Sequence, residues 1–237
     1  VPVFHQTKKT TKPIELDILI AENHLITIHN EPIEPLKDFI KKCEEKSDLK
    51  SKCFGPTSGH LFYWLSEELL NFAERQLVHI GKNINQIEDN MFKGKERELI
   101  KELLIVKRDI LDFRIAIRPQ NRIFNSLANR GINFWPEKST DLKIYFNDLI
   151  SDYERVWNEI DNYTGTINAL EDTHANLLSN KTNTIIRTFT ILSFITFPAM
   201  LVAAITEMNP ADLWLVIITI FFTSIFMWVY FKTKKWL

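Results

Sequence analysis

Residues 207–212 read Glu-Met-Asn-Pro-Ala-Asp and stand between two of the most apolar stretches of the chain. Carboxylate and amide side chains can bind cations or form hydrogen bonds with water. Two carboxylates and an amide in so short a connection therefore suggest chemistry with an ion or with solvent. Which of these applies depends on the segments that hold the connection.

A second set of residues, most of them with polar side chains, lies upstream, in steps of three and four residues that place them on one side of a helix. The set comprises Asn168, Asp172, Asn176, Ser179, Asn183, Ile186, Thr190, Ser193 and Phe197. One interpretation is a solvated face that ends in two hydroxyl side chains bonded to their own helix. The other is a pore lining shared by several copies, in which amide and hydroxyl rings carry a hydrated ion and Ile186 and Phe197 form hydrophobic constrictions.

Two uncharged runs of 19 residues, at 188–206 and 213–231, flank the hexapeptide. Each matches the roughly 20 apolar residues that a helix needs to cross the hydrocarbon core of a bilayer. A buried helix pair in a soluble protein is the alternative, but soluble cores rarely hold two such runs so close together. The pattern predicts two transmembrane helices joined by an outer loop at 207–212.

Positive charge lies on the same side of both runs. Lys181 and Arg187 precede the first run, and a lysine-rich tail at 232–237 follows the second, whereas the connecting loop carries only acidic charge. The positive-inside rule then places both termini in the cytoplasm of a multi-pass protein of the plasma (inner) membrane, in contact with the lipid bilayer. The net charge of −1 gives no indication of a nucleic-acid partner.

One long stalk helix is predicted over 139–187, continuing into the first transmembrane helix. Between Pro136 and Pro198 the chain has no proline and a single glycine. An unbroken helix over 140–205 would be about 100 Å long. Its apolar stripe, which indicates coiled-coil-like packing on neighbouring helices, comprises Leu142, Tyr145, Leu149, Tyr153, Val156, Ile160, Tyr163, Ile167, Leu170, His174 and Leu177.

The N-terminal residues 1–57 are predicted to be part of an α/β cytoplasmic domain. Alternating apolar residues at 14–30 indicate two strands around a turn at Glu22-Asn23, followed by a helix at 35–46. Two or three strands do not make a stable sheet alone. We therefore expect the chain to begin partway through this domain, or to be preceded by further residues.

Residues 58–138 are predicted to be a cytoplasmic helical region. Helical spacing of apolar residues covers 60–91, and a second helix is expected at 97–117. Arg118-Pro119 predicts a break or kink, because proline cannot donate the helical hydrogen bond. A third helical segment is expected at 120–129.

Taken together, these features resemble the CorA-type divalent-cation transporters over roughly 14–237. That family carries Gly-Met-Asn between two C-terminal transmembrane helices, and Glu207-Met208-Asn209 stands in its place as a variant of the mouth motif. The stretch LLSNKTNTIIRTFT at 177–190 is similar to the family's Ser-Asn-x-x-Asn-x-x-Met-Lys-x-Leu-Thr segment, and Pro198 falls at the proline of its first span. Two further matches are YFNDLISDYERV at 145–156 and IRPQNRIFNSL at 117–127.

The resemblance implies a homopentameric, funnel-shaped channel that takes up Mg²⁺ and is gated by intracellular cation bound between subunits. It implies that Asn209 contacts the hydrated cation at the outer entrance and that Asn183 is the pore asparagine near the inner end. Asp172 matches the aspartate where regulatory Mg²⁺ binds at the stalk interface, and Asp148 matches another acidic stalk position. Because Mg²⁺ dehydrates reluctantly, a ring of amides suits a hydrated ion.

Glu207 departs from the family's glycine at the mouth. Five such carboxylates would raise the local cation concentration but weaken discrimination by hydration shell. A transporter of Zn²⁺, Co²⁺ or Ni²⁺ in the same family is therefore an alternative. A membrane-anchored coiled-coil protein that conducts nothing is another.

The remaining reactive residue types show no arrangement typical of an enzyme. No nucleophile motif, phosphate-binding loop or catalytic carboxylate pair occurs, so no enzymatic activity is predicted. Cys43 and Cys53 are expected to be reduced structural thiols. His174 lies within the apolar stripe and is expected to pack at an interface rather than bind a metal.

Overall fold

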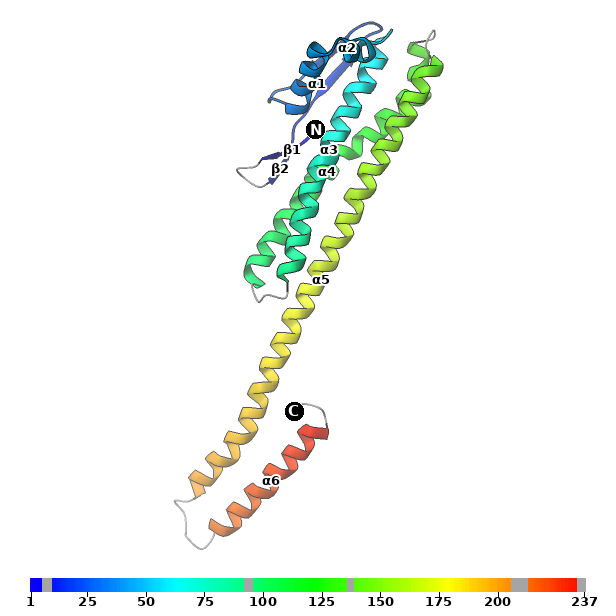
Figure 1. Cartoon of the computed structure of the whole chain (residues 1–237). Coiled ribbons are helices and arrows are strands. Elements are labelled where there is room, and N and C mark those ends of the chain that lie inside the picture. Colours follow the sequence, from blue (N-terminus) through cyan, green and yellow to red (C-terminus); the bar gives the residue numbers. More distant parts are fainter. Residues whose placement is uncertain (6–9, 92–95, 136–138, 206–212, 234–237) are drawn as a thin grey trace. The chain divides into compact units, whose positions relative to one another are not determined.

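The computed structural model of the chain describes five stretches, namely residues 1–5, 10–91, 96–135, 139–205 and 213–233 (Figure 1). The chain forms two compact units, Val1–Asp172 and Thr173–Leu237. In chain order the elements are β1 (Pro2–His5), β2 (Thr10–Pro13), β3 (Asp17–Ile20), β4 (Leu25–Ile28), α1 (Glu34–Glu45), α2 (Ser47–Phe54), α3 (Ser58–Asn90), α4 (Glu96–Asn129), the 3₁₀ turn η1 (Gly131–Phe134), α5 (Ser139–Ile205) and α6 (Leu213–Thr233).

The strands form two separate antiparallel pairs, β1 with β2 and β3 with β4. In the second pair Ile20 lies opposite Leu25, which confirms the two strands and the turn predicted at 14–30. Both pairs lie against helices, because β1 and β2 contact α4 and β4 contacts α3. Two-stranded sheets of this size are therefore held by helix packing rather than by sheet formation.

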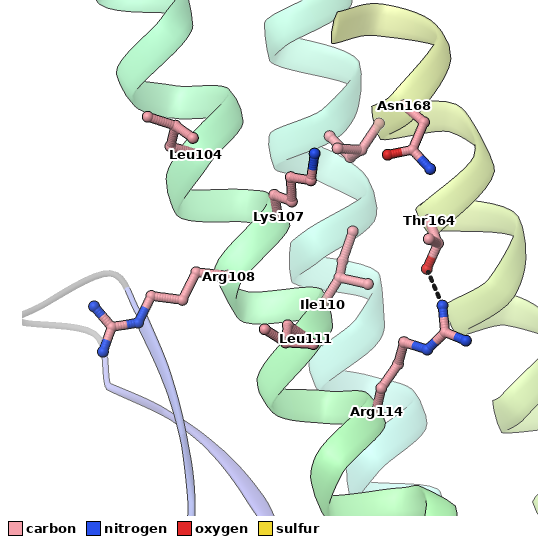
Figure 2. Close-up of a pocket in the computed structure, with 9 residues that line it drawn as sticks. Leu104, Lys107, Arg108, Ile110, Leu111, Arg114, Thr164 and Asn168 are labelled. Carbon is pink, nitrogen blue, oxygen red and sulfur yellow. Dashed lines mark hydrogen bonds between the residues drawn. The ribbon is translucent and has the colours of Figure 1, made fainter.

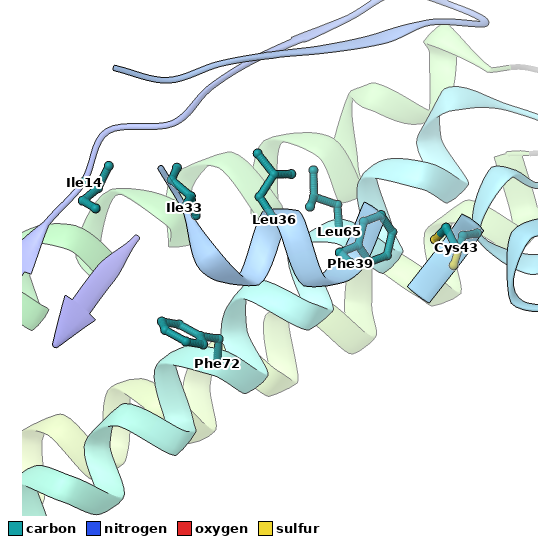
Figure 3. Close-up of a cluster of buried hydrophobic side chains, with 8 residues drawn as sticks. Ile14, Ile33, Leu36, Phe39, Cys43, Leu65 and Phe72 are labelled. Carbon is teal, nitrogen blue, oxygen red and sulfur yellow. The ribbon is translucent and has the colours of Figure 1, made fainter. Parts of the chain in front are cut away.

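Helix α1 confirms the helix predicted at 35–46, and its buried face closes a small hydrophobic core. Leu36, Phe39 and Cys43 are spaced by three and four residues, so they share the side of α1 that turns toward α3. The buried cluster comprises Ile14, Ile33, Leu36, Phe39, Cys43, Cys53, Leu65 and Phe72 (Figure 3).

Cys43 and Cys53 are free thiols inside this core, and their side chains are hydrogen-bonded to each other. Burial, together with the neighbouring Cys43, raises the pKa of the Cys53 thiol to about 12. A thiol with so high a pKa forms little thiolate and reacts slowly. The pair behaves as the structural thiols that the sequence predicts.

Of the break or kink predicted at Arg118-Pro119, the break is wrong because α4 continues through Pro119 as one helix, whereas the kink stays a prediction. Proline removes one helical hydrogen bond and crowds the preceding turn. Gln120 donates from Nε2 to the carbonyl oxygen of Ala116 at 3.2 Å, next to the Ile115 carbonyl that Pro119 leaves without its helical donor. Ile117 and Phe124, on either side of the proline, are both buried, so tertiary packing stabilises the helix before and after Pro119.

Helix α5 confirms the predicted long helix, since its 67 residues run without interruption over about 100 Å. Within the first unit every residue of the apolar stripe from Leu142 to Leu170 is buried or half-buried. Aromatic contacts tie this stripe to its neighbours. The Tyr145 ring meets that of Tyr63 on α3, and the Tyr153 ring meets that of Phe124 on α4.

The second unit contains the rest of α5 and the helix α6. Among the helices that the described residues form, none combines the length and the hydropathy needed to cross a membrane. The two transmembrane helices at 188–206 and 213–231 stay predictions from the sequence.

Candidate functional site

The polar side chains predicted to share one face of α5 do so, because α5 is continuous through all of them. Asn176, Ser179 and Asn183 are exposed, and Thr190 and Ser193 are half-buried. Ile186 and Phe197 interrupt this polar face with aliphatic and aromatic surface, at 58% and 69% exposure. The face is thus open in a single chain and lies apart from the buried apolar stripe.

The two hydroxyls on this face bond to the backbone of their own helix. Thr190 Oγ1 donates to the carbonyl oxygen of Ile186 at 2.8 Å, and Ser193 Oγ donates to that of Phe189 at 2.9 Å. Each hydroxyl oxygen keeps lone pairs that can accept a further hydrogen bond. The waters around a divalent cation present hydrogens outward, so such a face can still accept a hydrated ion.

Asp148 lies where α5 meets α3, and Tyr63 of α3 donates a hydrogen bond from Oη to its Oδ2 at 2.8 Å. Burial, followed by this hydrogen bond to the carboxylate, raises the pKa of the Tyr63 phenol above its usual value. The tyrosine therefore stays neutral and remains a donor. It orients one oxygen of Asp148.

Further carboxylates gather beside Asp148. Burial and then the charges of Asp152, Asp148 and Glu68 raise the pKa of Glu67. The pKa of Asp152 is raised mainly by burial, although the cation of Arg155 opposes the shift. Negative charge is thus concentrated between α3 and α5.

The two predicted metal positions on the stalk do not come together. Asp148 and Asp172 are 24 residues apart on one helix, which separates them by roughly 36 Å. Asp172 is exposed, and its neighbour Glu171 pairs with Lys107 of α4. Across the described part of the chain, no three His, Cys, Asp or Glu side chains gather as a metal-ligand set. A metal at either aspartate would need water or another chain to complete its ligands.

The mouth motif Glu207-Met208-Asn209 lies outside the described residues, between the end of α5 at Ile205 and the start of α6 at Leu213. Its role stays a prediction. His174, predicted to pack rather than bind a metal, is buried in the apolar stripe.

Sequence patterns did not single out Tyr63, Glu67 or Asp152. Tyr63 and Glu67 are four residues apart and so share one side of α3. Nothing in that spacing shows that the side meets Asp148, because the contact joins residues 85 positions apart.

A sequence profile described as "CorA-like Mg2+ transporter protein" matches residues 2–234. The "Cobalt/magnesium transport protein CorA" of Thermotoga maritima is 27% identical over 187 residues, which are 75% of this chain and 52% of that protein. The protein of the same name from Methanocaldococcus jannaschii is 22% identical over 246 residues, covering 100% of this chain and 75% of that one. The chain therefore spans about half the length of the Thermotoga relative.

Two solved structures share the fold. The complete structure of the CorA magnesium transporter from Methanocaldococcus jannaschii has a TM-score of 0.79 at 22% identity, with 100% of this chain and 75% of that chain covered. The full-length CmaX protein has a TM-score of 0.71 at 19% identity, with 94% and 68% covered. At such identities the likeness is one of fold, a long helical stalk following an N-terminal domain.

Proposed function

The chain belongs to the CorA-like Mg²⁺ transporter family, and from this membership we propose that it forms a homopentameric channel in the plasma (inner) membrane that takes up divalent cations, Mg²⁺ foremost. In this proposal residues 188–206 and 213–231 cross the bilayer and both termini face the cytoplasm. The observation that carries the proposal is the exposed polar face of α5, which continues without a break into an uncharged stretch.

The side chains around that face are of the kind that contact lipid. Outside it, α5 and α6 expose large apolar side chains, among them Phe189, Ile195, Trp214 and Phe226. Apolar surface of this kind is stable against lipid or another protein rather than in water. A helix with one polar side in such surroundings is best explained if several copies turn their polar sides toward a shared aqueous axis.

Five copies of the face would line a pore for a hydrated ion. Rings of Asn183, Thr190 and Ser193 would accept hydrogen bonds from the waters of the cation, which is a milder demand than stripping them from Mg²⁺. Rings of Ile186 and Phe197 would form apolar constrictions that close by dewetting. Asn176 and Ser179 would extend the polar path toward the cytoplasm.

At the outer mouth, Asn209 would hold the hydrated cation, with Met208 and Glu207 beside it. The five Glu207 carboxylates would concentrate cations at the entrance. This charge favours a second candidate function, transport of Zn²⁺, Co²⁺ or Ni²⁺, because charge attraction discriminates less between divalent ions than hydration geometry does.

Regulation would follow from the stalk carboxylates. Copies of Asp172 would repel one another across subunit contacts when no metal is bound, and Asp148 would add negative charge higher on the stalk. Mg²⁺ bound there from the cytoplasm would offset the repulsion and favour the closed state. Loss of the ion would then shift the population toward the open state.

Flux into proteoliposomes tests the proposal, with Mg²⁺, Zn²⁺, Co²⁺ and Ni²⁺ compared side by side. We expect Mg²⁺ uptake by the unaltered chain and a large loss in Asn183→Ala. Thr184→Ala is the control, because Thr184 is exposed and follows Asn183 directly, which turns its side chain about 100° away from that of Asn183. A chain that passes none of the four ions would favour the non-conducting membrane anchor, with which the self-bonded hydroxyls of Thr190 and Ser193 are also compatible.

A further inference from the structure

Helix α4 presents a surface that combines aliphatic and cationic side chains. Its members recur in steps of three and four residues and so share one side of the helix. They are Leu104, Lys107, Arg108, Leu111, Arg114, Ile115, Arg118 and Arg122, here called the α4 face. The three aliphatic members are each more than half exposed, at 55% to 57%. Exposed aliphatic surface of this extent on one helix indicates a contact with another molecule.

A groove of about 440 Å³ runs beside the α4 face, between α4 and α5 (Figure 2). Its apolar wall includes Ile110 and Leu111 of α4 and Ile167 of α5. Two of the cations at its rim have carboxylates nearby. Lys107 pairs with Glu171, and Arg114 lies near Asp161.

Two arginines of the α4 face have no carboxylate partner within the described part of the chain. These are Arg108 and Arg122, and both are exposed. The surface therefore offers aliphatic contact together with unmatched cations. It fits a partner that supplies carboxylates.

The same chain carries the opposite pattern where α3 packs on α5. Tyr63 of α3 donates a 2.8 Å hydrogen bond to Asp148 of α5, and Glu67 lies one helical turn after Tyr63, so Glu67, Asp148 and Asp152, here called the acidic edge, border the same contact of α3 with α5. Arg155 lies 3.1 Å from Asp152, but Glu67 has no cationic partner among the described residues. This edge holds unmatched negative charge.

The two surfaces lie at overlapping levels along α5. Arg114 of α4 contacts Thr164, and Phe124 of α4 meets Tyr153, so Arg122 lies near the level of Tyr153. Asp152 of the acidic edge adjoins that same tyrosine in the sequence. When copies are related by rotation about an axis parallel to α5, equivalent residues stay at the same height along that axis. The α4 face of one copy can therefore meet the acidic edge of the next copy.

We infer that the α4 face of one copy binds the acidic edge of the adjacent copy, with Arg122 directed at Glu67. Two different and complementary surfaces on one chain are what a ring of identical subunits requires, because each contact joins unlike patches. The aliphatic members supply buried apolar area, and the charges set register and partner choice. The inference rests on the proposed homo-oligomer and adds the surface through which it assembles.

Charge reversal tests this contact in the full chain in mild detergent. Native mass spectrometry and sedimentation over a dilution series measure the concentration at which half the assembly dissociates. Arg122→Glu and Glu67→Arg should each raise that concentration by about ten-fold or more. The double variant, Arg122→Glu with Glu67→Arg, should return it toward the value of the unaltered chain, because the pair is restored with its charges exchanged.

Arg130→Glu is the matched control, since Arg130 is an exposed arginine just beyond α4 and outside the face. Circular dichroism checks that every variant is folded. If the chain is oligomeric and both single reversals assemble normally, this contact is wrong while the proposed channel stands. A double variant as weak as the single ones would also overturn it. A chain that is monomeric at every concentration would overturn the proposed oligomer itself.

Discussion

Tyr63 Oη donates a hydrogen bond of 2.8 Å to Asp148 Oδ2, and this bond joins α3 to α5 across 85 positions of sequence. The phenol is buried, whereas the aspartate lies at the surface. The core of the first unit thereby orients a carboxylate that faces outward. The hydrogen bond fixes the direction of one carboxylate oxygen of Asp148.

Replacing Tyr63 by phenylalanine removes this bond and keeps the ring. We expect the free energy of unfolding to fall by about 1–2 kcal/mol, because the bond has an ionised acceptor but is partly open to solvent. Denaturant titration of the dissociated chain measures the change. Tyr145→Phe serves as the control. The centroid of the Tyr145 ring lies 4.6 Å from that of Tyr63, and the Tyr145 hydroxyl makes no hydrogen bond among the described residues. Equal losses in the two variants would show that the bond contributes nothing.

Glu67 should make the dissociated chain less stable as pH rises. Its pKa in the folded chain is raised above the ordinary 4.5, first by burial and then by Asp152 and Asp148. The folded chain therefore holds this proton more tightly than the unfolded chain, so stability declines as pH passes from 4.5 through the raised pKa. Glu67→Gln should then be more stable than the unaltered chain at pH 7, and the gain should vanish below pH 4.5. Thermal unfolding between pH 4 and 8 tests this, and a gain that is constant with pH would contradict it.

Two glycines in helices should respond oppositely to alanine. A Cβ at Gly165 meets nothing within 4 Å, so Gly165→Ala should stabilise the chain by about 0.5–1 kcal/mol through helix propensity alone. A Cβ at Gly81 would lie 2.5 Å from Tyr163 Oη, which is held by a hydrogen bond to Glu159. Gly81→Ala should therefore destabilise the chain despite the same gain in propensity. The free energies of unfolding of the two variants, measured side by side, test this prediction. A stabilised Gly81→Ala would mean that Tyr163 moves aside freely.

Asp172→Ala should leave the proposed channel less inhibited by internal Mg²⁺, because one charge that the ion would offset is gone from each subunit contact. Flux is measured from proteoliposomes at a series of internal Mg²⁺ concentrations. Asp141→Ala, an exposed carboxylate in the first turn of the same helix, is the control. Unchanged inhibition in Asp172→Ala would place regulation elsewhere.

Asn209→Ala should reduce transport to near background while folding is kept, since the amide would be lost from every subunit at the mouth. Glu207→Gly restores the residue usual in the family. It should raise the half-saturating concentration for all divalent cations and sharpen the preference for Mg²⁺, because attraction by charge falls while selection by hydration remains. Normal conduction by Asn209→Ala would refute the assignment of the mouth and favour the anchor.

The sequence by itself determines the elements whose signals are local. Sixty-seven residues of α5 contain one glycine and a single proline near the end, Pro198, so nothing interrupts the apolar spacing that makes a long helix. Period-two alternation likewise predicts β3 and β4, and uninterrupted uncharged runs need no tertiary information to be recognised. The match to a transporter family also comes from residues in linear order.

Only the tertiary structure decided the features that depend on neighbours distant in sequence. Pro119 predicts a break, yet packing of Ile117 and Phe124 keeps α4 whole, because burial of side chains on both sides outweighs one lost hydrogen bond. Helical spacing identifies apolar stripes but does not say which are covered. Leu149 of α5 is fully buried and Leu111 of α4 is left open, although both belong to regular stripes, and the difference lies in where α3, α4 and α5 meet.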